Sequence, residues 1–374
     1  MFHPLRVSEV ERLTDDSVAV TFAVPPELRD AFRHVPGQHL TLRRSAPATG
    51  GGEGTATDPD GPDGPSGEEI RRTYSICSPA AGPGEDPVLR VGIRLVEGGV
   101  FSTYALKELL AGDTVDVMEP MGRFLLAPRP GRFAAVVGGS GITPVLSMAT
   151  TLLEREPGAR FCLIRSDRSA ASTMFLEEVA DLKDRYPDRF QLVTVLSREE
   201  QQAGLPSGRL DRPRLTELLP ALLPVGEVDG WFLCGPLGLV LGADRALRDL
   251  GVDRGRIHQE IFHVDDGRTT GGDDRPAAAP VAARARLTAT LDGRSGNWPV
   301  QPGESLLDTV LRARSDAPYA CKGGVCGTCR AFLAGGEVRM DRNYALEPEE
   351  TDAGYVLACQ SHPVSPEVEL DFDR

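Results

Sequence analysis

The sequence predicts a multidomain protein with three folded parts: a small antiparallel β-barrel, a doubly wound parallel α/β sheet, and an α+β domain that carries a cysteine-rich loop. Three observations predict this. Short runs rich in β-branched residues follow one another over residues 1–128, and strand, glycine turn and helix alternate over residues 129–264. A linker-like segment, 265–283, then separates these parts from the last domain, 284–374.

The first part contains six strand-like runs and one helix candidate, near residues 102–111. The runs are 5–10, 18–24, 36–42, 72–77, 88–96 and 114–118. They alternate in polarity or are continuously apolar, which favours a small antiparallel barrel. Between the third and fourth runs, residues 46–69 hold six acidic and no basic side chains. Such a segment cannot bury enough apolar surface to offset its ordering entropy, so we expect a disordered insert without a function of its own.

The second part repeats buried strand, tight turn and helix, which argues for a parallel sheet. The expected strands are 132–137, 161–165, 191–196, 230–234 and 257–264, and the expected helices include 144–154, 172–185 and 237–250. Residues 265–283 contain Gly, Pro, Ala and charge without aromatic residues, which is typical of a linker. In the last domain we expect a hairpin over 286–300 that turns at Asp292-Gly293, a helix at 305–314 and a final strand at 368–372.

Composition and charge exclude several classes of protein. The net charge of −14 includes −6 from the acidic insert, and no basic patch indicates nucleic-acid binding. No apolar run approaches the roughly 18 residues that a membrane helix needs, and the first residues contain no apolar signal core. Four of the seven cysteines lie in one motif, and the odd three that remain, Cys77, Cys162 and Cys234, are a poor disulfide framework. We therefore expect a cytoplasmic protein.

The cysteine motif is the most specific feature of the sequence. Cys321, Cys326 and Cys329 follow the spacing C-x4-C-x2-C, and Cys359 completes four. This is the plant-type spacing that holds a [2Fe–2S] cluster through four thiolates. Glycines in the loop permit left-handed backbone and let amide N–H groups point at sulfur: Gly323, Gly324 and Gly327. A structural zinc site is the alternative, but such sites favour two C-x2-C pairs, and the second pair is missing.

Two glycine turns are candidates for phosphate binding. The loop Gly138–Pro144 lies between an expected strand and an expected helix, where it lets a pyrophosphate approach the backbone and the helix N-terminus. The turn Gly98–Thr103 also precedes a helix. On a strand of the barrel, Arg72 can pair with a flavin phosphate, Tyr74 can stack on the flavin ring and Ser75 can hydrogen bond to its N5. Read separately, each glycine loop is also consistent with an ordinary tight turn, and Tyr74 with a core position.

Together these motifs resemble the ferredoxin–NADP reductase superfamily. Arg72, Tyr74 and Ser75 are similar to its flavin motif, and Gly99, Val100, Phe101 and Ser102 to its flavin-phosphate turn. The nicotinamide-phosphate loop is matched by Gly139, Gly141, Ile142, Thr143 and Pro144, and the nicotinamide-side motif by Cys234, Gly235 and Pro236. With a ferredoxin domain at the C-terminal end, the chain resembles reductase components of bacterial oxygenases. The shared stretches are most similar to the reductase subunits of phenylacetyl-CoA epoxidases.

The resemblance implies a Greek-key barrel that binds FAD, an α/β domain that binds a nicotinamide, and a β-grasp ferredoxin domain. It implies hydride transfer from the nicotinamide to the flavin, with Ser75 and Cys234 as the catalytic residues. Electrons would then pass through the cluster to a partner oxygenase, for which a di-iron epoxidase of phenylacetate degradation is expected. The alternatives are a reductase of another oxygenase that uses NADH, and a redox-responsive cluster-binding protein without turnover.

The choice of nucleotide depends on residues that follow the second strand of the α/β part. Ser166 and Arg168 are suited to a 2′-phosphate, whereas Asp167 is suited to accept from a 2′-hydroxyl. The resemblance favours NADPH, with NADH as the alternative. It also brings Glu260 and Phe262 toward the flavin, although a core or edge position fits them equally well.

Overall fold

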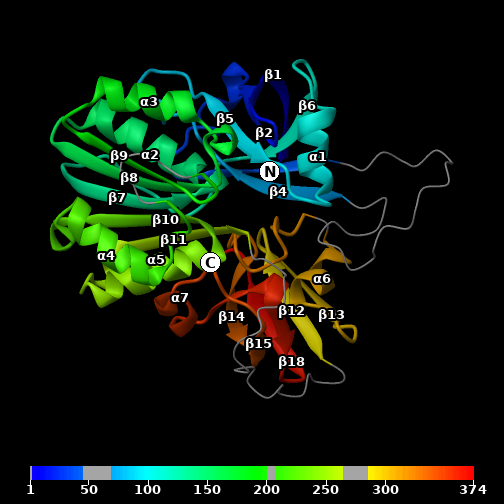
Figure 1. Ribbon diagram of the computed structural model, residues 1–374. Helices are drawn as coiled ribbons and strands as arrows, with labels where there is room; N and C mark the ends of the chain where they lie inside the picture. Colours follow the sequence, from blue (N-terminus) through cyan, green and yellow to red (C-terminus); the bar gives the residue numbers. More distant parts are fainter. Residues whose placement is uncertain (1, 45–68, 200–206, 264–284, 315) are drawn as a thin grey trace. The chain divides into compact units, whose positions relative to one another are not determined.

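The computed structural model describes residues 2–44, 69–199, 207–263, 285–314 and 316–374 (Figure 1). The chain divides into two compact units, Met1–Val264 and Asp265–Arg374. The expected linker and nearly all of the acidic insert lie outside the described residues. The first unit contains two different sheets, and the boundary expected between them at residues 128 and 129 stays a prediction.

The predicted antiparallel barrel is present in the first unit. Its strands are β1 Phe2–Thr14, β2 Ser17–Ala23, β3 His39–Arg44, β4 Ile70–Ser75, β5 Leu89–Arg94 and β6 Thr114–Met118, in the order β4-β3-β6-β1-β2-β5. A bridge between Ile76 and Val91 joins the two ends of this order, so the sheet closes on itself. Inward-facing apolar side chains such as Val20, Leu40 and Val91 are fully buried and form the barrel core. Helix α1, Val100–Lys107, packs its Phe101 into that core.

The second sheet is parallel throughout, as predicted. Its strands are β7 Gly131–Gly138, β8 Ala159–Asp167, β9 Phe190–Leu196, β10 Gly230–Pro236 and β11 Ile257–His263, in the order β11-β10-β7-β8-β9. Helices α2 Ile142–Arg155, α3 Leu176–Arg185, α4 Arg212–Leu222 and α5 Leu237–Asp249 flank it (Figure 1). Because both faces are covered, the central strands β7 and β10 are mostly apolar and buried, whereas the edge strand β11 carries His, Gln and Glu. The strand order reverses between β7 and β10, which is where such sheets bind ligands.

Three helices of the first unit differ from the expectation, and the first is α1, which ends at Lys107 and not at residue 111. Helix α3 begins at Leu176 and not at residue 172, because Ala170–Ser172 form a short 3-10 turn and Phe175 has a left-handed backbone with φ of 55°. Helix α4 was not singled out from the sequence. Asp211 caps it by accepting a hydrogen bond from the N–H of Arg214, and Pro213 occupies its first turn, which are both ordinary signals of a helix start.

The second unit is an α+β domain built on a mixed sheet with the order β13-β12-β18-β14-β16. These strands are β12 Arg286–Leu291, β13 Arg294–Pro299, β14 Arg330–Gly335, β16 Tyr355–Leu357 and β18 Glu367–Asp371. The expected hairpin turns at Asp292 and Gly293, with φ of 52° and 67°, as a type I′ turn requires. A smaller pair, β15 Val338–Met340 with β17 Ser361–Pro363, and the helices α6 Leu306–Leu311 and α7 Pro348–Asp352 complete the unit.

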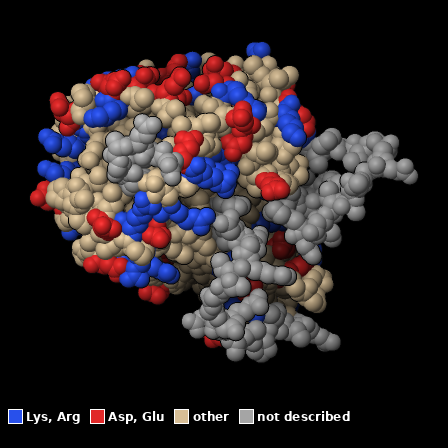
Figure 2. All heavy atoms as spheres, in the orientation of Figure 1, with Lys and Arg blue, Asp and Glu red and all other residues tan. Residues whose placement is uncertain are grey.

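Among the helices of the described residues, none combines the length and the apolar character needed to cross a bilayer. On the face seen in Figure 2, acidic and basic side chains are interspersed and do not form a patch of one sign.

Candidate functional site

Two loops meet where the parallel sheet reverses its strand order. The loop Gly138–Pro144 follows β7, and Cys234, Gly235 and Pro236 end β10, which is hydrogen bonded to β7. A Cβ on Gly141 would overlap the carbonyl oxygen of Cys234, and a Cβ on Gly235 would lie 2.8 Å from the carbonyl oxygen of Gly138. The two backbones therefore pack directly against each other, and this close approach explains why glycine occupies both positions.

The first of these loops leads into the N-terminus of helix α2. Ile142, Thr143 and Pro144 form the first turn of the helix and are buried. The Thr143 hydroxyl donates to the carbonyl of Ser140 at 2.9 Å, so it fixes the shape of the loop. The unpaired N–H groups and the positive dipole end of a helix N-terminus attract phosphate, and here they face the switch point of the sheet.

Ser75, Cys234 and Glu260 converge on one carboxylate oxygen. Ser75 ends β4 and donates to Glu260 Oε2 at 3.3 Å, and the Cys234 sulfur lies 3.8 Å from the same oxygen. Both Ser75 and Cys234 are buried. Burial raises the pKa of Glu260 to about 7, and burial also raises the pKa of the Cys234 thiol. A carboxyl group with a pKa near 7, between a hydroxyl and a thiol, is suited to hold or exchange a proton at neutral pH.

The predicted flavin motif and flavin-phosphate turn touch each other through two rings. Tyr74 packs against Phe101, with ring centroids 5.6 Å apart. Ser102 closes the preceding turn: its hydroxyl accepts from the N–H of Val96 at 3.1 Å and donates to the carbonyl of Gly99 at 3.2 Å. Burial raises the pKa of Tyr74 above its usual value, and the Arg72 guanidinium acts against this effect, so the two side chains are near each other.

The same turn leaves room for an anion. Gly98 has φ of 75°, and a Cβ added there would meet no atom within 4 Å. Gly99 and Val100 lead from this open space directly into helix α1. A flavin phosphate fits this arrangement because the helix start presents N–H groups toward it.

The three residues expected to bind the adenosine ribose differ in how exposed they are. Asp167 is 1% exposed and pairs with Arg165, also 1% exposed, at 2.7 Å, so its carboxylate is not presented to a ribose. Ser166 is half-buried at the carboxyl end of β8, next to Gly138 of β7, and Arg168 is exposed. The N–H of Arg198 donates to the carbonyl of Arg168 at 2.9 Å, which places two exposed arginines side by side at this edge.

Two residues of the candidate site come from distant strands and could not be identified from the sequence. Glu260 was left undecided because nothing local marks it, and only the pairing of β10 with β11 brings it to Cys234. Arg94 of β5 was not considered. Its guanidinium lies 2.8 Å from the place of a Cβ on Gly139, donates to the carbonyl of Ser172 and pairs with Asp16 at 3.3 Å. It therefore connects the barrel with the nucleotide loop, and no sequence signal indicates this.

The four cysteines of the second unit come from two segments of the chain. Cys321, Cys326 and Cys329 lie on one loop, and the N–H of Ala358 donates to the carbonyl of Cys329 at 3.1 Å, which places Cys359 beside Cys329. Within the described parts of the chain, no group of three ligating side chains is placed for a single metal ion. The C-x4-C-x2-C spacing with a distant fourth cysteine fits a two-iron cluster better than a structural zinc site, which favours two C-x2-C pairs.

The backbone of the cysteine loop is shaped toward sulfur. Lys322, Gly324 and Gly327 have positive φ angles of 49°, 78° and 69°. The N–H of Gly323 donates to the Cys321 sulfur at 3.3 Å. The Cys326 thiol lowers the pKa of Cys321 to about 5, whereas Cys321 and burial raise the pKa of Cys326. One proton is therefore held between these two neighbouring thiols.

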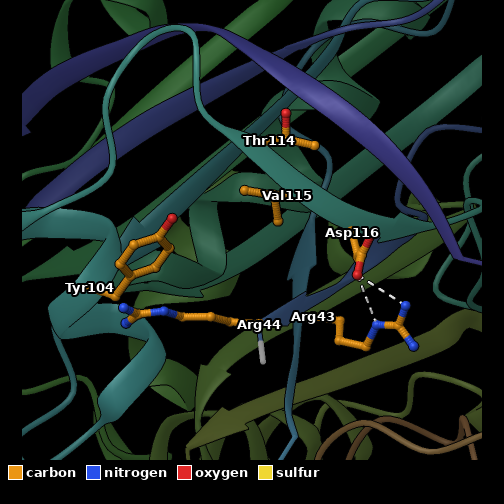
Figure 3. A pocket seen from close by; sticks show the side chains of 6 residues that line it. All are labelled: Arg43, Arg44, Tyr104, Thr114, Val115 and Asp116. Atoms are coloured by element: carbon orange, nitrogen blue, oxygen red, sulfur yellow. Dashed lines mark hydrogen bonds and ion pairs between the residues drawn. The ribbon is translucent and has the colours of Figure 1, made fainter. Parts of the chain in front are cut away.

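A shallow hollow of about 260 Å³ lies elsewhere on the barrel (Figure 3). Its lining comes from β3, α1 and β6: Arg43, Arg44, Tyr104, Thr114, Val115 and Asp116. The charged groups there are already paired, since Arg43 binds Asp116 at 2.9 Å and Arg44 stacks on Tyr104 at 3.7 Å. It shares no residue with the predicted flavin, nucleotide or cluster sites.

Comparisons with known proteins agree with this geometry. Residues 289–364 match the family described as 2Fe-2S iron-sulfur cluster binding domain, and residues 136–245 match the oxidoreductase NAD-binding domain. The chain is 41% identical to a subunit of 1,2-phenylacetyl-CoA epoxidase from Escherichia coli, over 100% of this chain and 98% of that protein. It is 32% identical to the ferredoxin reductase component of 3-ketosteroid-9-alpha-monooxygenase of Rhodococcus rhodochrous, over 98% and 96%.

Solved structures support the fold. Phthalate dioxygenase reductase aligns over 99% of this chain and 98% of its own, with a TM-score of 0.57 and 23% identity. At that identity the likeness extends to the fold alone.

Proposed function

Because the chain belongs to the family of oxygenase reductase components with a C-terminal [2Fe–2S] domain, we propose that it carries electrons from NADPH through FAD and the cluster to an oxygenase. A flavin between the two accounts for the change from the two electrons of a nicotinamide to the single electrons of an iron–sulfur cluster. The convergence of Ser75, Cys234 and Glu260 carries the proposal, because it unites the end of the flavin strand with the end of the nucleotide sheet.

The barrel residues would bind and orient the flavin. Arg72 and the N–H groups at the start of α1, from Gly99 to Ser102, are assigned to its phosphates. Tyr74 and Phe101 provide aromatic surface for its ring system. Ser75 is assigned to the reacting edge of the ring. Its single hydroxyl proton is donated to Glu260 Oε2 in this structure and becomes available to the ring when Glu260 is protonated.

The parallel sheet would bind the nicotinamide nucleotide at its switch point. The loop with Gly139, Gly141, Ile142, Thr143 and Pro144 is assigned to the pyrophosphate, and Cys234, Gly235 and Pro236 to the nicotinamide side. Glu260 Oε2 lies within reach of both Ser75 and Cys234, and burial raises its pKa to about 7, so both its protonated and its ionised form are accessible near neutral pH. We assign it to proton exchange with Ser75 Oγ.

NADPH is the proposed nucleotide. Asp167 is occupied by Arg165, which leaves the half-buried Ser166 and the exposed Arg168 to meet a 2′-phosphate. The exposed Arg198, which lies next to Arg168, adds a second positive charge at the same edge. An arginine pair of this kind favours a phosphate over a hydroxyl.

Cys321, Cys326, Cys329 and Cys359 are the proposed ligands of the [2Fe–2S] cluster, two to each iron. Thiolate ligands must stay reduced before the cluster is inserted, which suits the cytoplasm.

The proposed acceptor is a di-iron epoxidase that acts on phenylacetyl-CoA, supported by the 41% relative, whose name says that it is a subunit of phenylacetyl-CoA epoxidase. The test combines the purified chain with the catalytic subunits of such an epoxidase, phenylacetyl-CoA and NADPH. We expect substrate-dependent NADPH oxidation coupled to epoxide formation. If a ring-hydroxylating or steroid monooxygenase is supported at least as well, as the 32% relative suggests, the epoxidase assignment is wrong and the reductase assignment stands.

A further inference from the structure

The side chain of Gln360 ties together the two ends of the cysteine motif. Its amide nitrogen Nε2 donates to the carbonyl of Lys322 at 2.8 Å and to the carbonyl of Cys359 at 3.2 Å. Lys322 follows the first cysteine, and Cys359 is the last. One amide group therefore connects the segments that carry Cys321 and Cys359.

The Lys322–Gly323 peptide unit has a second hydrogen bond on its other side. Its N–H, which belongs to Gly323, donates to the sulfur of Cys321 at 3.3 Å. A peptide unit is planar and trans, so its C=O and N–H point in opposite directions. By holding the carbonyl of Lys322, Gln360 also fixes the direction of the N–H that points at the sulfur.

This peptide needs support because of its backbone conformation. Lys322 has φ of 49°, which is unfavourable for a residue with a Cβ. The following Gly324 lies against the stem of Gln360: a Cβ there would be 3.0 Å from Gln360 Cγ and 3.1 Å from the carbonyl oxygen of Arg342. Gln360 thus contacts the loop along its stem and through its amide.

We propose that Gln360 is a positioning residue that raises the reduction potential of the cluster by aiming the Gly323 N–H at the Cys321 sulfur. Reduction adds negative charge to the cluster and its sulfur ligands, and N–H donors to sulfur stabilise that charge. This inference deepens the proposed function, because it requires that the four cysteines hold a [2Fe–2S] cluster.

The test is a potentiometric titration of the full chain, followed by the electron paramagnetic resonance signal of the reduced cluster. Gln360→Leu keeps a side chain of similar length but removes the donor. We expect the equilibrium constant for reduction to fall about tenfold, the effect of one hydrogen bond to a charged group. For one electron this is a potential lower by about 59 mV. The matched control is Gln301→Leu, an exposed glutamine of the same unit, which should leave the potential unchanged.

A second variant separates tuning from folding. Gln360→Glu keeps the shape, cannot donate when ionised and adds negative charge, so its potential should fall at least as far as that of Gln360→Leu. Iron and acid-labile sulfide are measured in each protein. An unchanged potential in a fully loaded Gln360→Leu would overturn the proposal, as would loss of the cluster from both variants. A wild-type chain without iron and sulfide would contradict the proposed function itself.

Discussion

The two proposed redox sites of the chain are built in opposite ways. Ser75 and Glu260 are 185 positions apart, and Cys234 comes from a third strand, so their meeting depends on how a barrel and a parallel sheet pack. At the cluster site, Cys321, Cys326 and Cys329 lie on one short loop, and only Cys359 comes from further along the chain. The first site is therefore a product of tertiary structure, and the second mainly of local backbone shape.

The packing that supports the first site is visible at strand β5. A Cβ on Gly92 would lie 2.8 Å both from the Phe175 ring and from the Thr143 methyl, so barrel and nucleotide loop meet there without space for a side chain. Nearby, Arg90 stacks on Phe175 at 5.2 Å and pairs with Glu178 at 3.1 Å. Substitutions at the first site should therefore lower the rate of flavin reduction by degrees. Loss of a cysteine at the second site should instead abolish cluster binding.

The largest effect is expected at the local site. Cys326→Ser removes one of the four proposed cluster ligands, so the cluster should be lost and NADPH-driven oxygenase turnover should fall ~100-fold or more. Reduction of ferricyanide, which the flavin can serve directly, should persist. Cys162→Ala is the control, because Cys162 is a buried cysteine of the parallel sheet. A variant that retains iron, sulfide and oxygenase turnover would show that Cys326 is not a ligand.

Ser75→Ala tests the assembled site. It removes the hydroxyl that donates to Glu260, and we expect flavin reduction by NADPH to slow about 100-fold, the range found when one aligned donor is lost from a reacting centre. Stopped-flow absorbance under anaerobic conditions measures this rate, and the cluster spectrum should not change. The control is Ser8→Ala, an exposed serine of β1. Equal rates in wild type and Ser75→Ala would remove Ser75 from the reaction.

Arg168→Ala tests the nucleotide edge. Loss of one charge-assisted contact should raise the KM for NADPH about tenfold or more and leave that for NADH nearly unchanged. Arg198→Ala should act in the same direction if both arginines meet the phosphate. Arg185→Ala, an exposed arginine at the end of α3, is the control. Equal changes for both nucleotides would contradict the assignment.

The smallest effect is expected on the stability of the first unit and on how that stability depends on pH. Burial lowers the pKa of His39 from 6.5 to about 4, and the ring is 4% exposed. Between these pH values the unfolded chain binds a proton that the folded chain does not, so stability falls as pH falls from about 6.5 to about 4. The shift corresponds to about 3 kcal/mol in the first unit.

His39→Leu should remove that part of the pH dependence. Urea unfolding at pH 7 and at pH 4.5, followed by the fluorescence of Trp231 in a Trp298→Phe background, reports on the first unit alone. His34, whose pKa burial also lowers to about 4, should provide a similar remaining dependence. If wild type and His39→Leu lose the same stability between the two pH values, the buried ring does not contribute.

The same contrast explains what could be predicted from the sequence. The cysteine spacing is local and specific, and it predicted the iron–sulfur domain that the family match at residues 289–364 confirms. The barrel and the parallel sheet followed from periodicity and glycine turns, which are also local. The strands β15 and β17 have only three residues each, which is too short for a polarity pattern to identify them. Helix α3 begins later than expected because Phe175 has a left-handed backbone, which nothing in the sequence indicates.

Pairings between distant side chains were beyond the sequence. Asp167 could be read as a ribose ligand until its buried ion pair with Arg165 was seen. Likewise, Glu260 and Arg94 acquire their roles from neighbours on other strands, Cys234 and Gly139. Burial and pairing decide whether a charged group is available to a ligand, and neither is encoded within a few residues.

The central claim is that one chain joins a nicotinamide, a flavin and a [2Fe–2S] cluster in a single electron path. The most direct test is an anaerobic absorption titration of the purified protein with NADPH and, separately, with NADH. We predict that flavin and iron–sulfur bands are both present and that both bleach at close to stoichiometric NADPH. Bands that neither nucleotide bleaches, or a colourless protein that contains zinc, would contradict the account.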